Sequence, residues 1–124
     1  MRLALAPSVF LAAALSSCSP AADADYECYA LVRNAAGNPT AGVVVDLVAE
    51  RRGGDPFATS NFYTSGADGL AGPLRFGTKL STDQTVFVRA TARASGVTNT
   101  ATVTYDEADA RGPVVSVVVP LTVP

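Results

Sequence analysis

The side chains with the most reactive chemistry in this 124-residue chain are two cysteines, Cys18 and Cys28. A thiolate can act as a nucleophile, ligate a metal or form a disulfide, and a neighbouring imidazole often activates it. The chain contains no histidine, so it lacks the commonest general base and the commonest metal ligand. We therefore expect no catalytic residue, no metal site and no cofactor, and we expect the protein not to be an enzyme.

One acidic segment is a weaker candidate for ion binding. Asp106, Glu107 and Asp109 form the densest group of carboxylates, and oxygen-rich loops can bind Ca²⁺. The segment lacks a recognised calcium-loop pattern. A solvated acidic turn between two strands is the preferred interpretation.

Two further carboxylates, Asp46 and Glu50, lie four residues apart in a predicted strand. They are expected on its outward face if Val43, Val45 and Leu47 point inward. Spacing along one strand does not identify the pair of acids that a glycosidase needs, so exposure to solvent explains them sufficiently.

Five aromatic residues could form a patch that contacts a glycan or a peptide: Tyr26, Tyr29, Phe57, Phe62 and Tyr63. Filling the core and the sheet edges is the commoner fate of such residues, and it is the preferred interpretation here.

The N-terminal segment decides the fate of Cys18. Residues 1–17 combine one positive charge, an apolar stretch and small residues, as a cleaved signal peptide does. The stretch Leu15-Ser16-Ser17-Cys18 resembles the lipobox of bacterial lipoproteins. The resemblance implies that a diacylglycerol is attached to the Cys18 thiol, that cleavage occurs between Ser17 and Cys18, and that acyl chains such as palmitate anchor the mature protein.

Two alternatives to lipidation stay open. The small-x-small triplet Ala22-Asp23-Ala24 could direct an ordinary secretory cleavage, although it lies far from the apolar stretch. Cys18 could also be a plain small residue of a secretory signal.

A lipid on Cys18 would determine where the protein resides. Residues 18–25 are small and polar, which is typical of a flexible tether between the lipid and a domain. The residue after the cysteine is Ser19 rather than aspartate, and by the same resemblance this implies the outer membrane if the source is Gram-negative. We expect a lipid-anchored protein of the cell envelope whose partners are the membrane and an unidentified envelope protein or glycan.

Lipidation would leave Cys28 without a partner for an intrachain disulfide. Tyr26, Cys28, Ala30 and Val32 alternate along a predicted strand, so they are expected on its buried face. A buried, inert thiol is the preferred interpretation, and an intermolecular disulfide is the alternative.

Charge and hydropathy argue against two further classes of protein. Without residues 1–17 the chain carries 8 basic and 11 acidic side chains, a net charge of 8 − 11 = −3. The basic residues are scattered along the sequence, whereas nucleic-acid-binding domains concentrate theirs, so we expect no nucleic-acid partner. The apolar run 114–123 is shorter than the ~20 residues of a spanning helix, so we expect none in the mature chain.

Residues 26–124 are predicted to form one all-β domain. Short β-rich runs alternate with clusters of Gly, Pro, Asn and Asp about every 8 to 12 residues, which is typical of a sandwich or barrel. A hairpin is expected at residues 94–96, with Gly96 supplying a positive φ. The seven expected strands, which suit two packed sheets, are 26–33, 43–50, 57–64, 70–76, 84–93, 97–105 and 114–123.

The turns and strands of this domain also carry a resemblance. The stretches "GNPTAGVVVDLVAE", "TSGADGLAGPLRF" and "VFVRATARASGVTNTATVTY" resemble bacterial immunoglobulin-like domains of the invasin and intimin type and, less closely, transthyretin-like domains attached to carboxypeptidases. The resemblance implies an immunoglobulin-like or transthyretin-like antiparallel β-sandwich. A single copy is present, whereas invasin-type domains occur in tandem. The matching positions are Gly37, Asn38, Pro39 and Gly42, then Asp68 and Gly69, then Val88, Ala90 and Ala92.

Two functions are consistent with these features. The first is a structural or protein-interaction module displayed on a membrane. The alternative is a domain that binds a carbohydrate, a small ligand or an ion through the loops 51–60 and 105–113, because loops on rigid β scaffolds often carry function.

Overall fold

Alternation of buried and exposed residues along the central strands builds the domain. A computed structural model describes residues 23–53, 56–79 and 84–124. In β7 (Val114–Val123) exposed and buried residues alternate without exception. In β5 (Thr85–Ala92) the even-numbered residues are buried. Side chains of a strand point alternately to its two faces, so such strands direct one apolar face into a common core.

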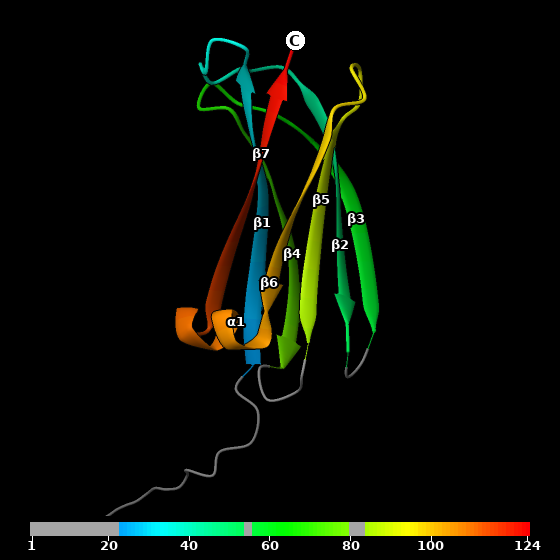
Figure 1. Cartoon of the computed structure of the whole chain (residues 1–124), viewed down its shortest axis with the longest axis vertical. Coiled ribbons are helices and arrows are strands. Elements are labelled where there is room, and N and C mark those ends of the chain that lie inside the picture. The colour runs from blue at the N-terminus through cyan, green and yellow to red at the C-terminus, as the bar shows by residue number, and fades with distance from the viewer. Residues whose placement is uncertain (1–22, 54–55, 80–83) are drawn as a thin grey trace, which may run out of the picture.

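Seven strands and one short helix make up the described chain (Figure 1). The seven expected strands are confirmed, and their ends lie within three residues of the expected ones. The remaining elements are β1 (Asp23–Asn34), β2 (Val44–Arg52), β3 (Phe57–Thr64), β4 (Leu70–Lys79), β6 (Thr98–Thr104) and α1 (Tyr105–Arg111).

The strands form two packed sheets, which confirms the all-β sandwich. One sheet has the order β4-β1-β7 and the other the order β3-β2-β5-β6. Pairing within the sheets is antiparallel except between β1 and β7, which run parallel along the whole of β7. The helix α1 reverses the chain between β6 and β7, so that β7 enters the other sheet alongside β1 (Figure 1).

The strand order differs from that of an immunoglobulin constant domain. That fold places its first, second, fifth and fourth strands in one sheet. Here β1 and β2 lie in different sheets. The sandwich therefore agrees with the expected architecture but not with the constant-domain arrangement of strands.

The core between the sheets consists mainly of small β-branched and alanine side chains. Tyr26, Leu47 and Leu121 are the largest side chains that are almost completely buried. Valines and alanines from both sheets fill the space between them. Close packing of such small residues brings the two sheets together.

One boundary differs from expectation. β1 begins at Asp23, so the last three residues assigned to the tether 18–25 belong to the sandwich, and Ala24 is buried. The predicted signal peptide 1–17, its cleavage site and Cys18 lie outside the described residues.

The acidic turn expected at residues 106–109 is instead the helix α1. Thr104 precedes the helix, and the Glu107 carboxylate accepts hydrogen bonds from the backbone N–H and the hydroxyl of Thr104. Thr104 and Glu107 form a capping box, which satisfies groups at a helix N-terminus. The helix is seven residues long, too short to show a helical periodicity in the sequence.

The turns lie at both ends of the sandwich. The turns that follow β1, β3 and β5 lie at one end, together with the C-terminus, and we call this the distal end. The hairpin at residues 94–96 is confirmed there, since Gly96 has a φ of 77°. The start of β1, the end of β2 and the helix α1 lie at the opposite end, which we call the proximal end (Figure 1).

Candidate functional site

Cys28 lies in the core rather than in a reactive site. It is fully buried, and it pairs with Leu74 of β4 and Val117 of β7. Burial raises the pKa of its thiol to about 12. The prediction of a buried thiol is confirmed, and the position excludes an intermolecular disulfide in the folded protein.

Native Cys28 is therefore expected to resist thiol reagents. In the Cys18→Ala variant, the reaction with a disulfide reagent at pH 8 should be at least roughly a thousandfold slower in the folded than in the urea-unfolded protein, because the thiolate is both scarce and inaccessible. Absorbance of the released thiol measures both rates. Comparable rates would show that β1 opens readily.

The acidic residues of α1 do not converge on a site for a cation. Glu107 is committed to Thr104, whose hydroxyl and backbone N–H hydrogen bonds lower the pKa of the carboxyl. Within residues 23–53, 56–79 and 84–124, no group of three or more potential metal ligands comes together.

The five aromatic residues do not form one patch. Tyr26 is buried and stacks on Phe76, with the ring centroids 4.9 Å apart. Phe57, on β3, also packs against Phe76, with 5.8 Å between the two ring centroids. Phe62 lies on the opposite face of β3 and is 56 % exposed. The expectation that these residues fill the core and the sheet edges is confirmed for Tyr26, for Tyr63, which packs against the core, and for Phe57 on the edge strand β3.

The described parts of the segments 51–53 and 105–113, from the two loops considered for ligand binding, lie at the proximal end of the sandwich (Figure 1). Most of the second loop is the helix α1. The first loop contributes Arg52 and Ser60 to a larger site that extends over a sheet face.

That site is the outer face of the four-stranded sheet, which we call the arginine face. It is formed by the side chains that alternate with the buried residues of β2, β3, β5 and β6. Three shallow hollows of 220, 270 and 340 Å³ lie on it. Its principal residues are Asp46, Val48, Glu50, Arg52, Ser60, Phe62, Phe87, Arg89, Arg93 and Thr100.

At one end of the arginine face, Arg93 joins an acid and an aromatic ring. Its guanidinium donates two hydrogen bonds to the Asp46 carboxylate, at 2.7 and 3.2 Å. The same group lies 4.7 Å from the centroid of the Phe62 ring. Hydrogen bonding to Arg93 lowers the pKa of Asp46. A bidentate ion pair and a cation–π contact together fix the plane of the guanidinium.

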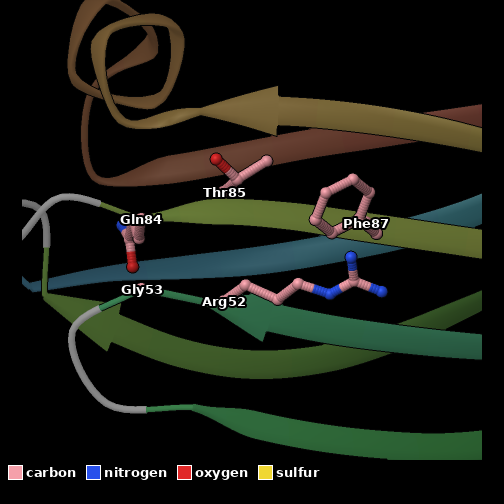
Figure 2. A pocket seen from close by; sticks show the side chains of 5 residues that line it. All are labelled: Arg52, Gly53, Gln84, Thr85 and Phe87. Atoms are coloured by element: carbon pink, nitrogen blue, oxygen red, sulfur yellow. The ribbon is translucent and has the colours of Figure 1, made fainter.

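A second unit of the same kind lies further along β2. Arg52 donates to Glu50 at 2.8 Å, and its guanidinium lies 4.4 Å from the Phe87 centroid. Figure 2 shows the long side chain of Arg52 extending beside Phe87, with Thr85, Gln84 and Gly53 continuing the hollow toward the proximal end. The arginine face thus carries two arginine–carboxylate–phenylalanine units.

Arg89 lies between these two units. It pairs across the sheet with Val48 on one side and Thr100 on the other, and it is exposed. Among the residues that the structure describes, it forms no ion pair, unlike Arg52 and Arg93. Three arginines against two carboxylates give this face a charge of 3 − 2 = +1, although the whole chain carries −2.

The sequence showed part of this face. Phe87, Arg89 and Arg93 alternate with buried residues of β5, and Asp46 and Glu50 were expected to point outward from β2, which the structure confirms. The pairing of β2 with β5, which are separated by two other strands in sequence, brings their charges together. The basic residues that look scattered in sequence are therefore partly gathered in space.

No protein-family model, curated protein or solved structure matches the chain. Among the described residues, no helix is both long and apolar enough to cross a membrane.

Proposed function

We propose that the protein is a lipid-anchored interaction module of the cell envelope, held to a membrane through Cys18. The observation that carries the proposal is the position of β1, which begins at Asp23, five residues after the lipobox cysteine. Five extended residues span at most about 18 Å. A lipid on Cys18 would therefore hold the sandwich close to the bilayer through a short linker.

This geometry defines which surfaces a partner can reach. The start of β1 lies at the proximal end, beside α1 (Figure 1). In the anchored protein that end faces the membrane. The distal turns and the two outer sheet faces then remain open to partners, and the loop 105–113 becomes the least accessible candidate.

The rival cleavage after Ala24 fits the sandwich poorly. Asp23 and Ala24 pair with Lys79 and Thr78 of β4, and Ala24 is 3 % exposed. Cleavage there would remove a buried side chain and two residues of the ladder. Cleavage before Cys18 leaves β1 complete.

A second candidate function, carbohydrate binding, is favoured by the arginine face. Its exposed hydroxyls, aromatic rings and fixed guanidinium groups lie on a flat sheet surface rather than in loops. The candidate carbohydrate-binding surface is therefore the outer face of the sheet rather than the loops.

Lipidation is tested by labelling with radioactive palmitate in a bacterial host. We expect the wild type to incorporate the label and to fractionate with the membrane. The Cys18→Ala protein should incorporate essentially no label and should leave the membrane fraction, because a domain without acyl chains has no comparable affinity for a bilayer. Cys28→Ser is the matched control and should stay labelled. Mass spectrometry that finds a mature N-terminus at Asp25 would contradict the proposal and establish ordinary secretion.

A further inference from the structure

Arg89 is an exposed cation that lines a surface hollow and forms no ion pair among the described residues. The hollow around it is lined by Val48, Glu50, Arg52, Phe87 and Thr100 and measures 220 Å³. Glu50 is held by Arg52 at 2.8 Å. An anion that reached this hollow would meet the exposed guanidinium of Arg89, with the nearest carboxylate already committed to another arginine.

Partners that add a strand to the sandwich are disfavoured at β7, one of the sheet edges. Asn99 of β6 donates its side-chain N–H to the carbonyl of Pro120 at 2.9 Å, while its side-chain oxygen accepts the Thr100 N–H at 2.9 Å. Arg111 donates to the carbonyl of Ser116 at 3.2 Å. Pro120 also has no N–H to offer. Edges blocked in these ways do not readily pair with a peptide strand.

The opposite side of the sandwich is partly closed as well. Arg51 donates to the carbonyl of Gly77 on β4 at 3.3 Å. The side-chain oxygen of Asn61 accepts the Phe62 N–H on β3 at 2.8 Å. Side chains therefore occupy some of the edge groups on both sides, which favours an outer sheet face over an edge as the docking surface.

The chemistry of the arginine face suits an extended acidic sugar polymer. Ser60 and Thr100 line its hollows, and hydroxyls of this kind match the hydroxyls of a sugar ring. A guanidinium binds a carboxylate through two parallel hydrogen bonds, which favours a uronic acid over a neutral sugar. The hollows are shallow and lie in succession along the sheet, so a chain of residues can follow them.

We propose that the arginine face binds a carboxylate-bearing polysaccharide and that Arg89 receives a uronate carboxylate, with Thr100 and Ser60 contacting the sugar hydroxyls. The proposal names the partner class of the interaction module and depends on the proposed function only for the cellular location of that partner. Ligand binding itself does not require a lipid on Cys18. A failure of lipidation and a failure of sugar binding are therefore separate results.

Isothermal titration calorimetry of the full-length protein in detergent with polygalacturonate tests this proposal. We expect binding that weakens at least tenfold in Arg89→Ala and recovers in part in Arg89→Lys, which restores the charge without the planar fork. Arg33→Ala is the matched control, because Arg33 is an exposed strand arginine of the other sheet with no ion pair among the described residues. It should bind like the wild type, and far-ultraviolet circular dichroism checks the fold of each variant.

Other probes distinguish the alternatives. Fully methyl-esterified polygalacturonate should bind at least tenfold more weakly, because the carboxylates are neutralised. Equal binding of poly-L-glutamate would overturn the sugar in favour of an acidic peptide, and equal binding of a single-stranded DNA oligonucleotide would indicate a general polyanion surface. Absent binding of polygalacturonate, or equal losses in the Arg89 and Arg33 variants, would overturn the proposal.

Discussion

Replacing Gly69 with alanine is expected to lower the free energy of unfolding by roughly 2–5 kcal/mol, combining backbone strain with a steric clash. Gly69 has a φ of 82°, and an added Cβ would lie 2.6 Å from the carbonyl oxygen of Val32. That oxygen accepts the Thr40 N–H at 2.9 Å, and the Gly69 carbonyl accepts the Val32 N–H at 2.7 Å. The new methyl group would therefore disturb backbone groups that join two distal turns.

A second glycine separates the two contributions to this loss. Gly96 has a φ of 77°, but an added Cβ would meet no atom within 4 Å. Gly96→Ala should therefore cost only the strain of a left-handed residue, about 1–2 kcal/mol. Urea unfolding followed by circular dichroism measures both variants. Equal losses would show that the contact with Val32 relaxes at no cost.

Truncating Tyr26 to alanine is expected to destabilise the sandwich by roughly 3–5 kcal/mol, the usual cost of removing a large buried aromatic ring. Tyr26 is fully buried, and its ring lies parallel to that of Phe76, within 4°. Neighbouring core residues are small, so few of them can expand into the space. The loss should appear as a lower urea midpoint and a lower melting temperature.

Tyr26→Phe isolates the hydroxyl from the ring. The Tyr26 hydroxyl is buried and has no hydrogen-bond partner among the described residues, so removing it should leave the free energy of unfolding unchanged or raise it by up to about 1 kcal/mol. A loss above 1 kcal/mol would show that the hydroxyl is bonded in solution.

The stabilities of the wild type and Tyr26→Phe are expected to depend differently on pH. Burial raises the pKa of Tyr26 above its ordinary value. The folded state then holds this proton more tightly than the unfolded state, so the stabilisation is complete below pH about 10 and is lost as pH rises through the folded pKa. Tyr26→Phe should lose less stability than the wild type between pH 9 and 11. Parallel curves would place the phenol in contact with solvent.

The sequence predicted the strands well because several of them obey a local rule. Val86, Val88 and Ala90 alternate with outward-facing residues, and that period needs no knowledge of neighbouring strands. The burial of Cys28 followed from the same rule. The helix α1 was missed because its seven residues are stabilised by a cap between Thr104 and Glu107 and by one buried side chain, Ala108, which is too little for a periodic pattern.

The candidate site could be predicted only in part from the sequence, for a different reason. Each strand displays its outward residues in the sequence, but not which strand lies beside it. Arg93 and Asp46 are 47 positions apart and meet because β2 pairs with β5. Bringing together residues so far apart in sequence costs loop-closure entropy, and no local sequence pattern reveals such a contact. The burial of both sheets compensates for that entropic cost.

The sequence by itself therefore determined the approximate bounds of the strands, the buried face of several of them and the lipobox resemblance at Cys18, because these depend on neighbours in the chain. The tertiary structure decided the parallel pairing of β1 with β7, the closing of the β7 edge by Asn99, and the gathering of Arg52, Arg89 and Arg93 on one face of an acidic chain. These features depend on contacts between residues distant in sequence, and packing of the two sheets selects those contacts.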